Sequence, residues 1–297
     1  MSTVFYKNCP VCKSGNIFFK LKAKDETVSK QYFEIWQCTN CSLRFTQNAP
    51  DEQQISDFYK SPEYISHSNT AKNLTDKLYY TVRSVTLNLK RKLVEKVSSK
   101  TSGNLLDIGA GTGAFASTMK KKGWNVTALE PDETARGNAN KDFNIELQPT
   151  NSLFSLQPNL YDVITLWHVL EHVHELHTYL NTFYSLLTQN GTLIIAVPNY
   201  TSFDAETYGE TWAAYDVPRH LYHFSPESMQ VLLIKHNFKP ADKKPMWFDS
   251  FYVSLLSEKY KNGKSAFFKA FKTGMVSNIK AVGKPENCSS VIYIAKK

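Results

Sequence analysis

The sequence has no long hydrophobic run. Its clearest uninterrupted apolar segment, Leu193 to Val197, is far shorter than the roughly 18 residues that a membrane-spanning helix needs, so we exclude a transmembrane protein. Residues 1–10 are polar and lack the apolar core of a secretory signal, which leads us to expect a cytoplasmic, reducing location. Hydrophobic residues still make up 42% of the 297 residues, enough to bury a core, and this excludes a mostly disordered chain.

Charge is distributed unevenly along the chain. The formal net charge of +8 divides into +7 for residues 1–100, −8 for residues 101–234 and +9 for residues 235–297. Basic ends of this kind attract phosphate on a nucleotide-linked substrate, a lipid surface or RNA, and they are equally typical of a plain solvated surface. Charge alone therefore leaves the partner open.

Cysteine is scarce, yet four of the five cysteines form two pairs. Each pair has two residues between its members, and 25 residues separate the pairs, which comprise Cys9, Cys12, Cys38 and Cys41. Two such turns brought together by a hairpin supply four thiolates for a tetrahedral Zn²⁺ ion. A closed site of this kind has no position for water, so we predict a structural zinc ribbon over residues 1–48. Disulfides are the disfavoured alternative because nothing indicates export.

A helical connector is expected over residues 49–102. A short helix is predicted from Asp51 to about Tyr59. Apolar residues then recur every three or four positions from Leu74 to Val97, which is the spacing of one face of a long amphipathic helix. We interpret this face as packing against the next domain and assign it no chemistry.

A glycine-rich turn follows a short apolar strand. The strand Asn104–Ile108 runs directly into Gly109–Gly113, which opens a helix predicted over Ala114–Lys122. Glycines permit a tight reversal and let a ligand touch the main chain where a Cβ would collide. A second strand, Asn125–Leu129, ends in Glu130, an acid that can accept hydrogen bonds from two ribose hydroxyls. NAD-binding proteins share this logic, but the spacing Gly-x-Gly-x-Gly differs from their Gly-x-Gly-x-x-Gly.

These motifs resemble those of class I S-adenosylmethionine-dependent methyltransferases. Four segments carry the likeness in the family's order: Leu105–Gly113, Ala128–Pro131, a fourth-strand motif at Tyr161–His172 and a fifth-strand motif at Gly191–Asn199. The resemblance implies S-adenosylmethionine as the cofactor and an α/β, Rossmann-like, seven-stranded methyltransferase fold. That domain is expected over residues 103–297, with insertions near 200–224 and 249–289.

The resemblance also implies which residues contact the cofactor. Those expected to cradle the methionine part are Asp107, Gly109, Ala110, Gly111 and Gly113. Those expected around the ribose and adenine are Glu130, Pro131, Asn151, Ser152 and Leu153. Trp167, just past the fourth strand, is expected to border the sulfonium.

Methyl transfer to a hydroxyl needs in-line alignment with the S–CH₃ bond and a group that takes the hydroxyl proton. The candidate catalytic residues are His168, Asp216 and His220. His168 follows the fourth strand, whereas the other two lie in the aromatic-rich segment 200–224. In the same segment, Arg219 is a candidate for binding a substrate phosphate or carboxylate. A packed lid with internal hydrogen bonds is the alternative interpretation of this segment.

The remaining histidines are assigned no chemistry. His172 is interpreted as a residue that satisfies a buried polar contact. A metal site made of His168, His172 and His177 is not expected, because a change from strand to helix breaks the face that two ligands would share.

The leading hypothesis is an enzyme that methylates a hydroxyl of a small molecule, such as a sugar or sugar nucleotide. The four-cysteine module together with Asp216–Phe224 is similar to bacterial methyltransferases of unassigned substrate, many of them connected with saccharide synthesis. An RNA methyltransferase that grips phosphates with the ribbon and the basic ends is the second hypothesis. A non-catalytic cofactor-binding protein is the third.

Overall fold

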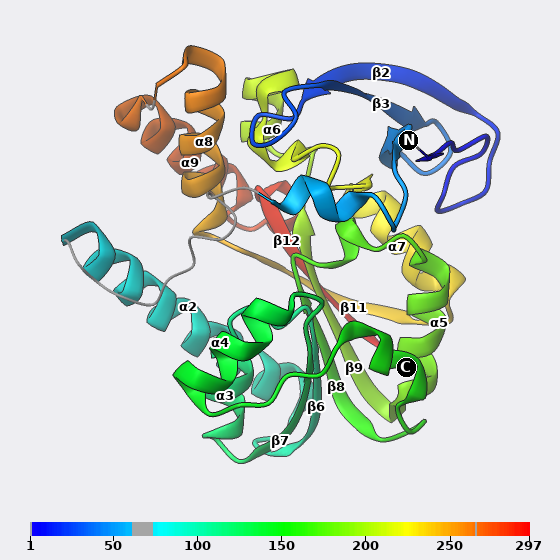
Figure 1. The fold of residues 1–297 in the computed structure, drawn as a ribbon, viewed down its shortest axis with the longest axis vertical. Helices are drawn as coiled ribbons and strands as arrows, with labels where there is room; N and C mark the ends of the chain where they lie inside the picture. The colour runs from blue at the N-terminus through cyan, green and yellow to red at the C-terminus, as the bar shows by residue number, and fades with distance from the viewer. Residues whose placement is uncertain (1, 61–73, 265) are drawn as a thin grey trace.

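The computed structural model describes residues 2–60, 74–264 and 266–297, and for residues 74–82 it describes the backbone alone. Its centre is a mostly parallel sheet (Figure 1) with the strand order β11-β12-β9-β8-β6-β7. The strands are β6 (Gly103–Ile108), β7 (Trp124–Leu129), β8 (Tyr161–Trp167), β9 (Leu187–Pro198), β11 (Lys239–Pro245) and β12 (Ser290–Lys296). The first four run parallel, and β12 is antiparallel to both of its neighbours. The predicted Rossmann-like α/β fold is confirmed.

The described sheet has six strands where we expected seven. Beyond the edge strand β7, the chain makes only an isolated parallel bridge between Gln148 and Leu129. Two backbone hydrogen bonds hold Gln148, one to Ala128 and one from Glu130. Pro149 comes next and has no N–H to donate, and a 3₁₀ helix, η2 (Thr150–Ser155), follows at once. Pairing therefore stops after one residue.

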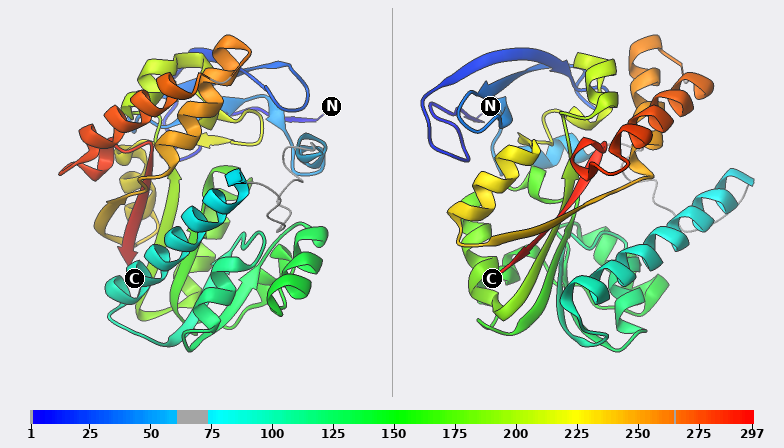
Figure 2. Two further views of the ribbon diagram at one scale, coloured as in Figure 1. Left: turned by 90° about the vertical axis from the view of Figure 1, so that its left-hand side faces the viewer. Right: turned by 180° about the vertical axis from the view of Figure 1, so that it is seen from behind.

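Helices cover both faces of the sheet (Figure 2) because its apolar strands are buried on both sides. Along β9, alternate residues face opposite ways, so that Ile194 and Ile195 belong to different core clusters. The five helices that flank the sheet are α2 (Leu74–Ser98), α3 (Ala114–Lys120), α4 (Glu133–Phe143), α5 (Leu176–Leu186) and α7 (Pro226–Lys235). Val94 of α2 and Met119 of α3 pack in the cluster of Ile194, whereas Phe183 of α5 packs in that of Ile195. The long helix is confirmed as α2, but its predicted packing face is only partly right. Leu93 and Val97 pack against the core beside the buried Val94, whereas Val85 and Leu89 are exposed. The side chains before residue 83 lie outside the described part.

The cysteine-rich region forms a second, antiparallel sheet. Its strands are β2 (Ile17–Lys24), β3 (Tyr32–Cys38) and β4 (Arg44–Gln47), and β10 (Tyr222–His223) completes it in the order β10-β4-β3-β2. Two short strands, β1 (Thr3–Val4) and β5 (Ala49–Pro50), pair beside it. Because β10 belongs to the segment after β9, residues 1–48 share a sheet with the segment that we expected to line the active site.

Short helices make up the connector and the insertions. The connector helix η1 (Ile55–Tyr59) begins later than the expected Asp51. The segment after β9 holds α6 (Phe203–Tyr208), η4 (Gly209–Thr211) and η5 (Ala213–Tyr215), and the carboxyl-terminal insertion holds α8 (Asp249–Asn262), α9 (Phe267–Ala281) and η6 (Pro285–Asn287). A further turn, η3 (Leu170–His172), directly follows β8 and Trp167. It will prove central to the site.

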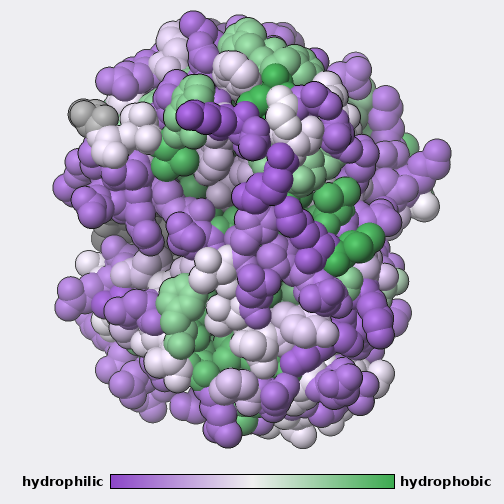
Figure 3. Space-filling view, turned by 90° about the vertical axis from the view of Figure 1, so that its right-hand side faces the viewer, coloured by the Kyte–Doolittle hydropathy of each residue, from purple (hydrophilic) through white to green (hydrophobic). Residues whose placement is uncertain are grey.

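The surface agrees with the absence of long apolar runs. On the side of the molecule drawn in Figure 3, hydrophilic residues predominate and hydrophobic residues lie in separate groups among them. Within the described ranges, none of the helices has the length and apolar character to cross a membrane.

Candidate active site

The glycine loop leaves one side of its main chain accessible. Gly109, Gly111 and Gly113 have φ angles of +65°, +55° and +74°, a region that favours glycine. A Cβ on Gly109 would lie 2.5 Å from a methyl carbon of Val169, so this glycine is packed against the turn after β8. At Gly111, by contrast, no described atom lies within 4 Å of the Cβ position. The loop therefore has room for a ligand at Gly111 and is closed by protein atoms at Gly109.

Glu130 connects the loop to the end of β7. Its carboxylate accepts hydrogen bonds from the Gly111 N–H, at 2.7 Å, and from the Asp132 N–H, at 3.1 Å. Burial raises the pKa of Glu130, and these two bonds oppose the shift. Glu130, which we predict to bind the ribose, is thus also hydrogen-bonded to the glycine loop. On its outer side, Arg136 donates to the carbonyl oxygens of Glu130 and Pro131.

Asp107, the last acid before the loop, is buried. Thr165 of β8 donates a hydrogen bond to it at 2.7 Å. Burial raises the pKa of Asp107 to about 7, although the Thr165 bond and the nearby Lys90 ammonium oppose the shift. The Lys90 ammonium also lies 4.4 Å from the centroid of the Trp167 ring. Asp107 is therefore partly protonated near neutral pH and would respond to a new positive charge beside it.

The residues predicted near the adenine differ in exposure. Asn151 and Pro131 are exposed, Ser152 is half-buried and Leu153 is fully buried in the main core. Trp167 packs edge-on against Phe115, and its indole N–H has no hydrogen-bond partner among the described residues. The structure brings the loop, Glu130 and Trp167 to the carboxyl ends of adjacent strands. Their roles toward the cofactor, and those of Asn151, Ser152 and Leu153, stay predictions.

His168 is held between two carboxylates. Its Nε2 lies 2.8 Å from Asp249 at the start of α8, and its Nδ1 lies 3.3 Å from Glu171 of η3. Burial lowers the pKa of His168, but Asp249 and Glu171 outweigh it and raise the pKa to about 10. The ring is therefore protonated at neutral pH. Its predicted role as a proton acceptor is untested, and in this arrangement both carboxylates oppose it.

Glu171, His172 and His220 form a compact group that we call the histidine cluster. One ligand-type atom from each lies within 4.8 Å of the others, and the two imidazole rings meet edge to face with centroids 4.5 Å apart. Burial and the charge of His220 lower the pKa of His172 to about 4, although Glu171, Asp216 and the Arg219 carbonyl oxygen oppose the shift. Asp216 lies beside the cluster, with Oδ2 3.9 Å from Nε2 of His220. The candidates Asp216 and His220 are thus neighbours, and His172, which we had assigned a structural role, lies with them.

Arg219 ties three segments together beneath this cluster. It is 1% exposed and donates to both carboxylate oxygens of Asp216, at 2.6 and 3.1 Å. It also donates to Asp25 of the β2–β3 hairpin at 3.2 Å and to the carbonyl oxygen of Phe58 at 2.9 Å. Among these contacts Arg219 has an internal, structural position, as the packed-lid interpretation expects. Substrate binding by Arg219 stays untested.

The four paired cysteines meet at one point. The Sγ atoms of Cys9 and Cys41 lie 3.5 Å apart, as do those of Cys12 and Cys38. All are free thiols, and bonds of about 2.3 Å in a tetrahedron put sulfur atoms about 3.8 Å apart. The cluster therefore fits a metal ion after small adjustments. The fifth cysteine, Cys288, is buried elsewhere.

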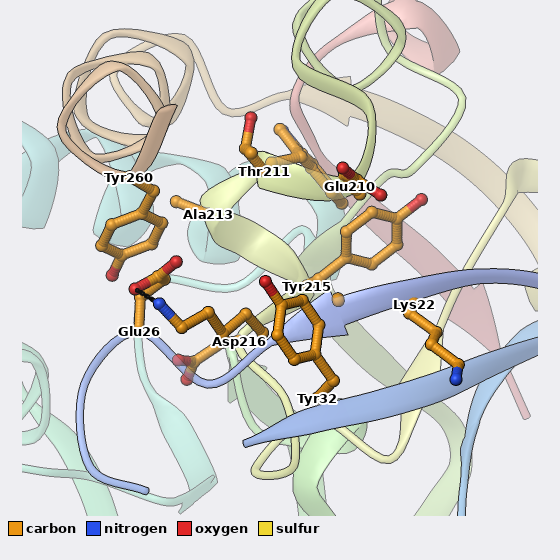
Figure 4. Close-up of a pocket in the computed structure, with 12 residues that line it drawn as sticks. Lys22, Glu26, Tyr32, Glu210, Thr211, Ala213, Tyr215, Asp216 and Tyr260 are labelled. Carbon is orange, nitrogen blue, oxygen red and sulfur yellow. Dashed lines mark ion pairs between the residues drawn. The ribbon is translucent and has the colours of Figure 1, made fainter. Parts of the chain in front are cut away.

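Two cavities lie where the hairpin meets the segment after β9. The first, of about 60 Å³, is lined by polar and aromatic side chains from the hairpin, the η4–η5 segment and α8 (Figure 4), among them Glu26, Tyr32, Glu210, Asp216 and Tyr260. The second, of about 350 Å³, lies on the other side of Tyr215 and is lined partly by Arg44 and Tyr200. Arg44 stacks over the Tyr200 ring at 4.0 Å and donates to the Tyr215 hydroxyl at 2.6 Å.

Sequence reasoning missed three members of this site. Tyr59 of η1 has its hydroxyl 2.9 Å from Nδ1 of His172, Glu171 joins His168 to the histidine cluster, and Asp249 pairs with His168. Only Glu171 had a usable signal, because it directly precedes His172 in the fourth-strand motif. Tyr59 and Asp249 are 113 and 81 residues from their partners, and no local pattern marks them.

Comparison with known proteins identifies the family. Residues 83–242, more than half of the chain, match the family model described as "Methyltransferase domain". The chain therefore belongs to this family of S-adenosylmethionine-dependent methyltransferases.

Curated relatives are distant. An uncharacterized methyltransferase of Staphylococcus carnosus is 29% identical over 147 residues, which cover 49% of this chain and 69% of that protein. A ubiquinone biosynthesis O-methyltransferase of Rickettsia typhi is 29% identical over 157 residues, which cover 49% of this chain and 63% of that protein. The alignment with a Xanthomonas campestris protein of the same name covers 54% of its length. The matched residues thus cover between 54% and 69% of the length of these three relatives.

Two solved structures with similar folds are described as methyltransferases. One from Archaeoglobus fulgidus, described as a SAM-dependent methyltransferase, has a TM-score of 0.48 at 21% identity and covers 72% of this chain and 94% of that one. The phosphoethanolamine N-methyltransferase 2 of Haemonchus contortus has a TM-score of 0.49 at 16% identity, with 71% and 52% covered. These overall similarities are low, and the family assignment rests on the sequence match.

Proposed function

We propose that this protein transfers a methyl group from S-adenosylmethionine to a hydroxyl of a small molecule, such as a sugar or sugar nucleotide. The observation that carries the proposal is that the turn after β8 packs on the glycine loop and also carries two residues of the histidine cluster. Val169, the residue that packs on Gly109, lies two residues before Glu171 and three before His172. A donor seated at the loop and an acceptor seated at the cluster would be neighbours.

The cofactor would rest on residues from the ends of two strands, β6 and β7. Gly111 offers open main chain, Glu130 offers a carboxylate to the ribose hydroxyls, and Asp107 offers a negative charge to the methionine part. The cofactor supplies a methyl group on a sulfonium, which is a good leaving group. The protein therefore has to align the acceptor and exclude water, and alignment of this kind is worth about 7 to 11 kcal/mol.

Asp216 and His220 are the proposed proton acceptors. Burial raises the pKa of Asp216, but hydrogen bonds and charge from Arg219 outweigh it, so the pKa stays below its ordinary value and the group is a carboxylate at neutral pH. In His220, Nδ1 lies 2.9 Å from the carbonyl oxygen of Ala214, which only accepts. In that contact Nδ1 donates, so Nε2, which lies on the side of Asp216, is the nitrogen that would take the proton in the proposed reaction.

We also propose the domain limits and the structural zinc. Residues 1–48 would be a zinc ribbon, residues 49–102 a helical connector, and residues 103–297 the methyltransferase domain with its insertions. Four thiolates would hold Zn²⁺ in the ribbon, which fits the reducing cytoplasm expected from the sequence. This ion would stabilise the hairpin whose Asp25 reaches Arg219.

The test is release of S-adenosylhomocysteine with a panel of sugars, nucleotide-linked sugars and phenols, with short RNA as a separate arm. We expect turnover with one small-molecule class, and a loss of about 10²- to 10⁴-fold in kcat for His220→Gln. His174→Gln is the matched control, because His174 is outside the cluster and contacts the carbonyl oxygen of Pro50. Turnover with RNA alone, or cofactor binding without turnover on any arm, would contradict the proposal.

A further inference from the structure

The histidine cluster has the composition of a metal site that is separate from the four cysteines. Among the described residues, Glu171, His172 and His220 are the second group whose ligand atoms gather closely enough to hold an ion. We propose that these three side chains bind a divalent transition-metal ion beside the acceptor position. This group shares only His172 with the group considered from the sequence, which also contained His168 and His177. Glu171 and His220 are its other two members.

Both histidines hold one ring nitrogen against a carbonyl oxygen. Nδ1 of His172 lies 3.1 Å from the carbonyl oxygen of Arg219 and 2.9 Å from the Tyr59 hydroxyl, and Nδ1 of His220 lies 2.9 Å from the carbonyl oxygen of Ala214. A carbonyl oxygen only accepts, so these contacts favour a proton on each Nδ1, which leaves Nε2 as the nitrogen that would bind an ion. Histidine ligands in proteins almost always donate their other N–H in this way, which fixes the tautomer and the ring orientation.

The third ligand is a buried carboxylate oxygen in need of a partner. Glu171 is fully buried. Its Oε1 pairs with His168, but its Oε2 has no hydrogen-bond partner in the part of the chain that the structure describes. A carboxylate oxygen left unpaired in a buried position is costly. A cation shared with the two imidazoles would remove this cost.

The geometry requires only a small contraction. Bonds of 2.0 to 2.2 Å in a tetrahedron put the ligand atoms about 3.3 to 3.6 Å apart, and one ligand-type atom of each residue now lies within 4.8 Å of the others. A closure of up to about 1.5 Å, shared among three side chains by small rotations, completes the site. The main chain behind them is tied, since Leu221 N–H donates to the carbonyl oxygen of Glu171 at 2.8 Å.

The donor set selects the kind of ion. Two imidazoles and one carboxylate suit Zn²⁺, Mn²⁺, Fe²⁺ and Co²⁺, whereas Mg²⁺ and Ca²⁺ prefer oxygen ligands throughout. Three protein ligands leave a position open, unlike the closed set of four cysteines. The ion would therefore be able to take an oxygen atom from solvent or from a bound molecule.

This open position suggests a role, and that role rests on the proposed function. An acceptor hydroxyl bound to the ion would have a lowered pKa, so a weak base is enough to take its proton. With Nε2 of His220 occupied, Asp216 is the neighbouring carboxylate that receives the proton. The metal would then fix the acceptor oxygen for attack on the methyl group.

The site is tested by metal binding without turnover. Mn²⁺ is the main probe, because thiolates prefer softer ions and the ribbon should take it poorly. Full-length protein carrying zinc in its ribbon is titrated with Mn²⁺ by calorimetry, and zinc is counted by mass spectrometry before and after. We expect one additional Mn²⁺ per chain, with the zinc content unchanged. Co²⁺ added to the same protein should give a spectrum without thiolate bands.

Glu171→Gln and His220→Gln are the test variants. Each should weaken Mn²⁺ binding by more than the roughly 10- to 100-fold that loss of an outer hydrogen-bond partner costs a metal site. His174→Gln should bind as the wild type does. Full retention of ribbon zinc and an unchanged circular dichroism spectrum would show that a variant has folded.

Three results would overturn the inference: no binding of Mn²⁺, Co²⁺ or added Zn²⁺ up to millimolar concentration, binding that survives in both folded variants, or thiolate bands from the added Co²⁺. These results are independent of the proposed function. A chain that binds the ion but turns over no substrate would contradict the proposed function and leave the metal site in place.

Discussion

Replacing Arg219 with methionine isolates the contact that joins the hairpin, the connector and the segment carrying Asp216. Methionine keeps much of the volume and removes the charge. The guanidinium is 1% exposed and faces Asp25, which is fully buried, and Asp216. The variant therefore leaves two carboxylates in a buried region without their cation. Breaking a buried ion pair by removing one partner costs about 3 to 5 kcal/mol.

The expected loss of stability is large enough to measure directly. A loss of about 4 kcal/mol corresponds to a fall in Tm of about 8 to 16 °C, at 2 to 4 °C per kcal/mol for a chain of this size class. Urea unfolding at pH 7 gives the free energy of unfolding, and calorimetry gives Tm. Lys60→Met is the control, because Lys60 pairs with Asp57 at 2.6 Å but both side chains are largely exposed. Such a surface pair is worth at most about 1 kcal/mol.

The difference between wild type and variant should depend on pH. Burial raises the pKa of Asp25 and of Asp216, but hydrogen bonds from Ser29 to Asp25, and Arg219 at both, outweigh it and hold both pKa values below the ordinary range. Groups of this kind add stability above the unfolded-state pKa near 4, and the stability is lost as the pH falls. The gap between the two proteins should therefore narrow between pH 7 and pH 3. Arg219→Met that behaves like Lys60→Met, or a gap that widens in acid, would refute the reasoning.

Cofactor binding should release a proton near pH 7. Because burial raises the pKa of Asp107 to about 7, a cation bound beside it should expel about 0.5 proton at that pH; calorimetry in two buffers should detect this, and Asp107→Asn should abolish it. Cys38→Ser should lose the ribbon zinc and lower Tm, whereas Cys288→Ser should keep one zinc per chain by mass spectrometry; zinc retained in Cys38→Ser would count against the ribbon. Gly113→Ala should lower the free energy of unfolding in urea by about 1 to 3 kcal/mol, because φ is +74° and the new Cβ would lie 2.9 Å from the Cβ of Ala139 on α4. Gly137→Ala, whose new Cβ would meet open space, should be neutral or stabilising. Equal effects of the two alanines would be the contrary result.

Local sequence patterns were enough to predict the proposed cofactor-binding half of the site. An apolar strand, a glycine turn and an acid at the end of the next strand lie within 30 residues, and parallel strands bring their carboxyl ends to one edge. Gly111 and Glu130 accordingly meet at 2.7 Å. The two Cys-x-x-Cys turns were equally readable, because each places two sulfur atoms locally and a hairpin suffices to join them. We expected seven strands in the main sheet, and the described residues form six. The proline after Gln148 ends the pairing there.

The proposed acceptor half of the site depends on contacts between residues that are far apart in the chain. His172 and His220 are 48 residues apart, and His168 and Asp249 are 81 residues apart. His177 was set aside as a metal ligand in the sequence analysis, and its ring contacts His236 and the carbonyl oxygen of Pro10. Likewise, nothing local indicates that β10 pairs with β4 of the cysteine-rich sheet.

By itself, then, the sequence determined the family, the cofactor loop and the four-cysteine cluster, because backbone conformation and spacing specify these over short stretches. Only the tertiary structure shows that Arg219 is buried between Asp25 and Asp216 and that His168 lies between two carboxylates. It also shows that ligand-type atoms of Glu171, His172 and His220 lie within 4.8 Å of one another. The physical reason is that the charge state of a buried group and the partner of a ring nitrogen depend on neighbours from other elements. Those neighbours are set by packing, and packing has no short-range signature in the chain.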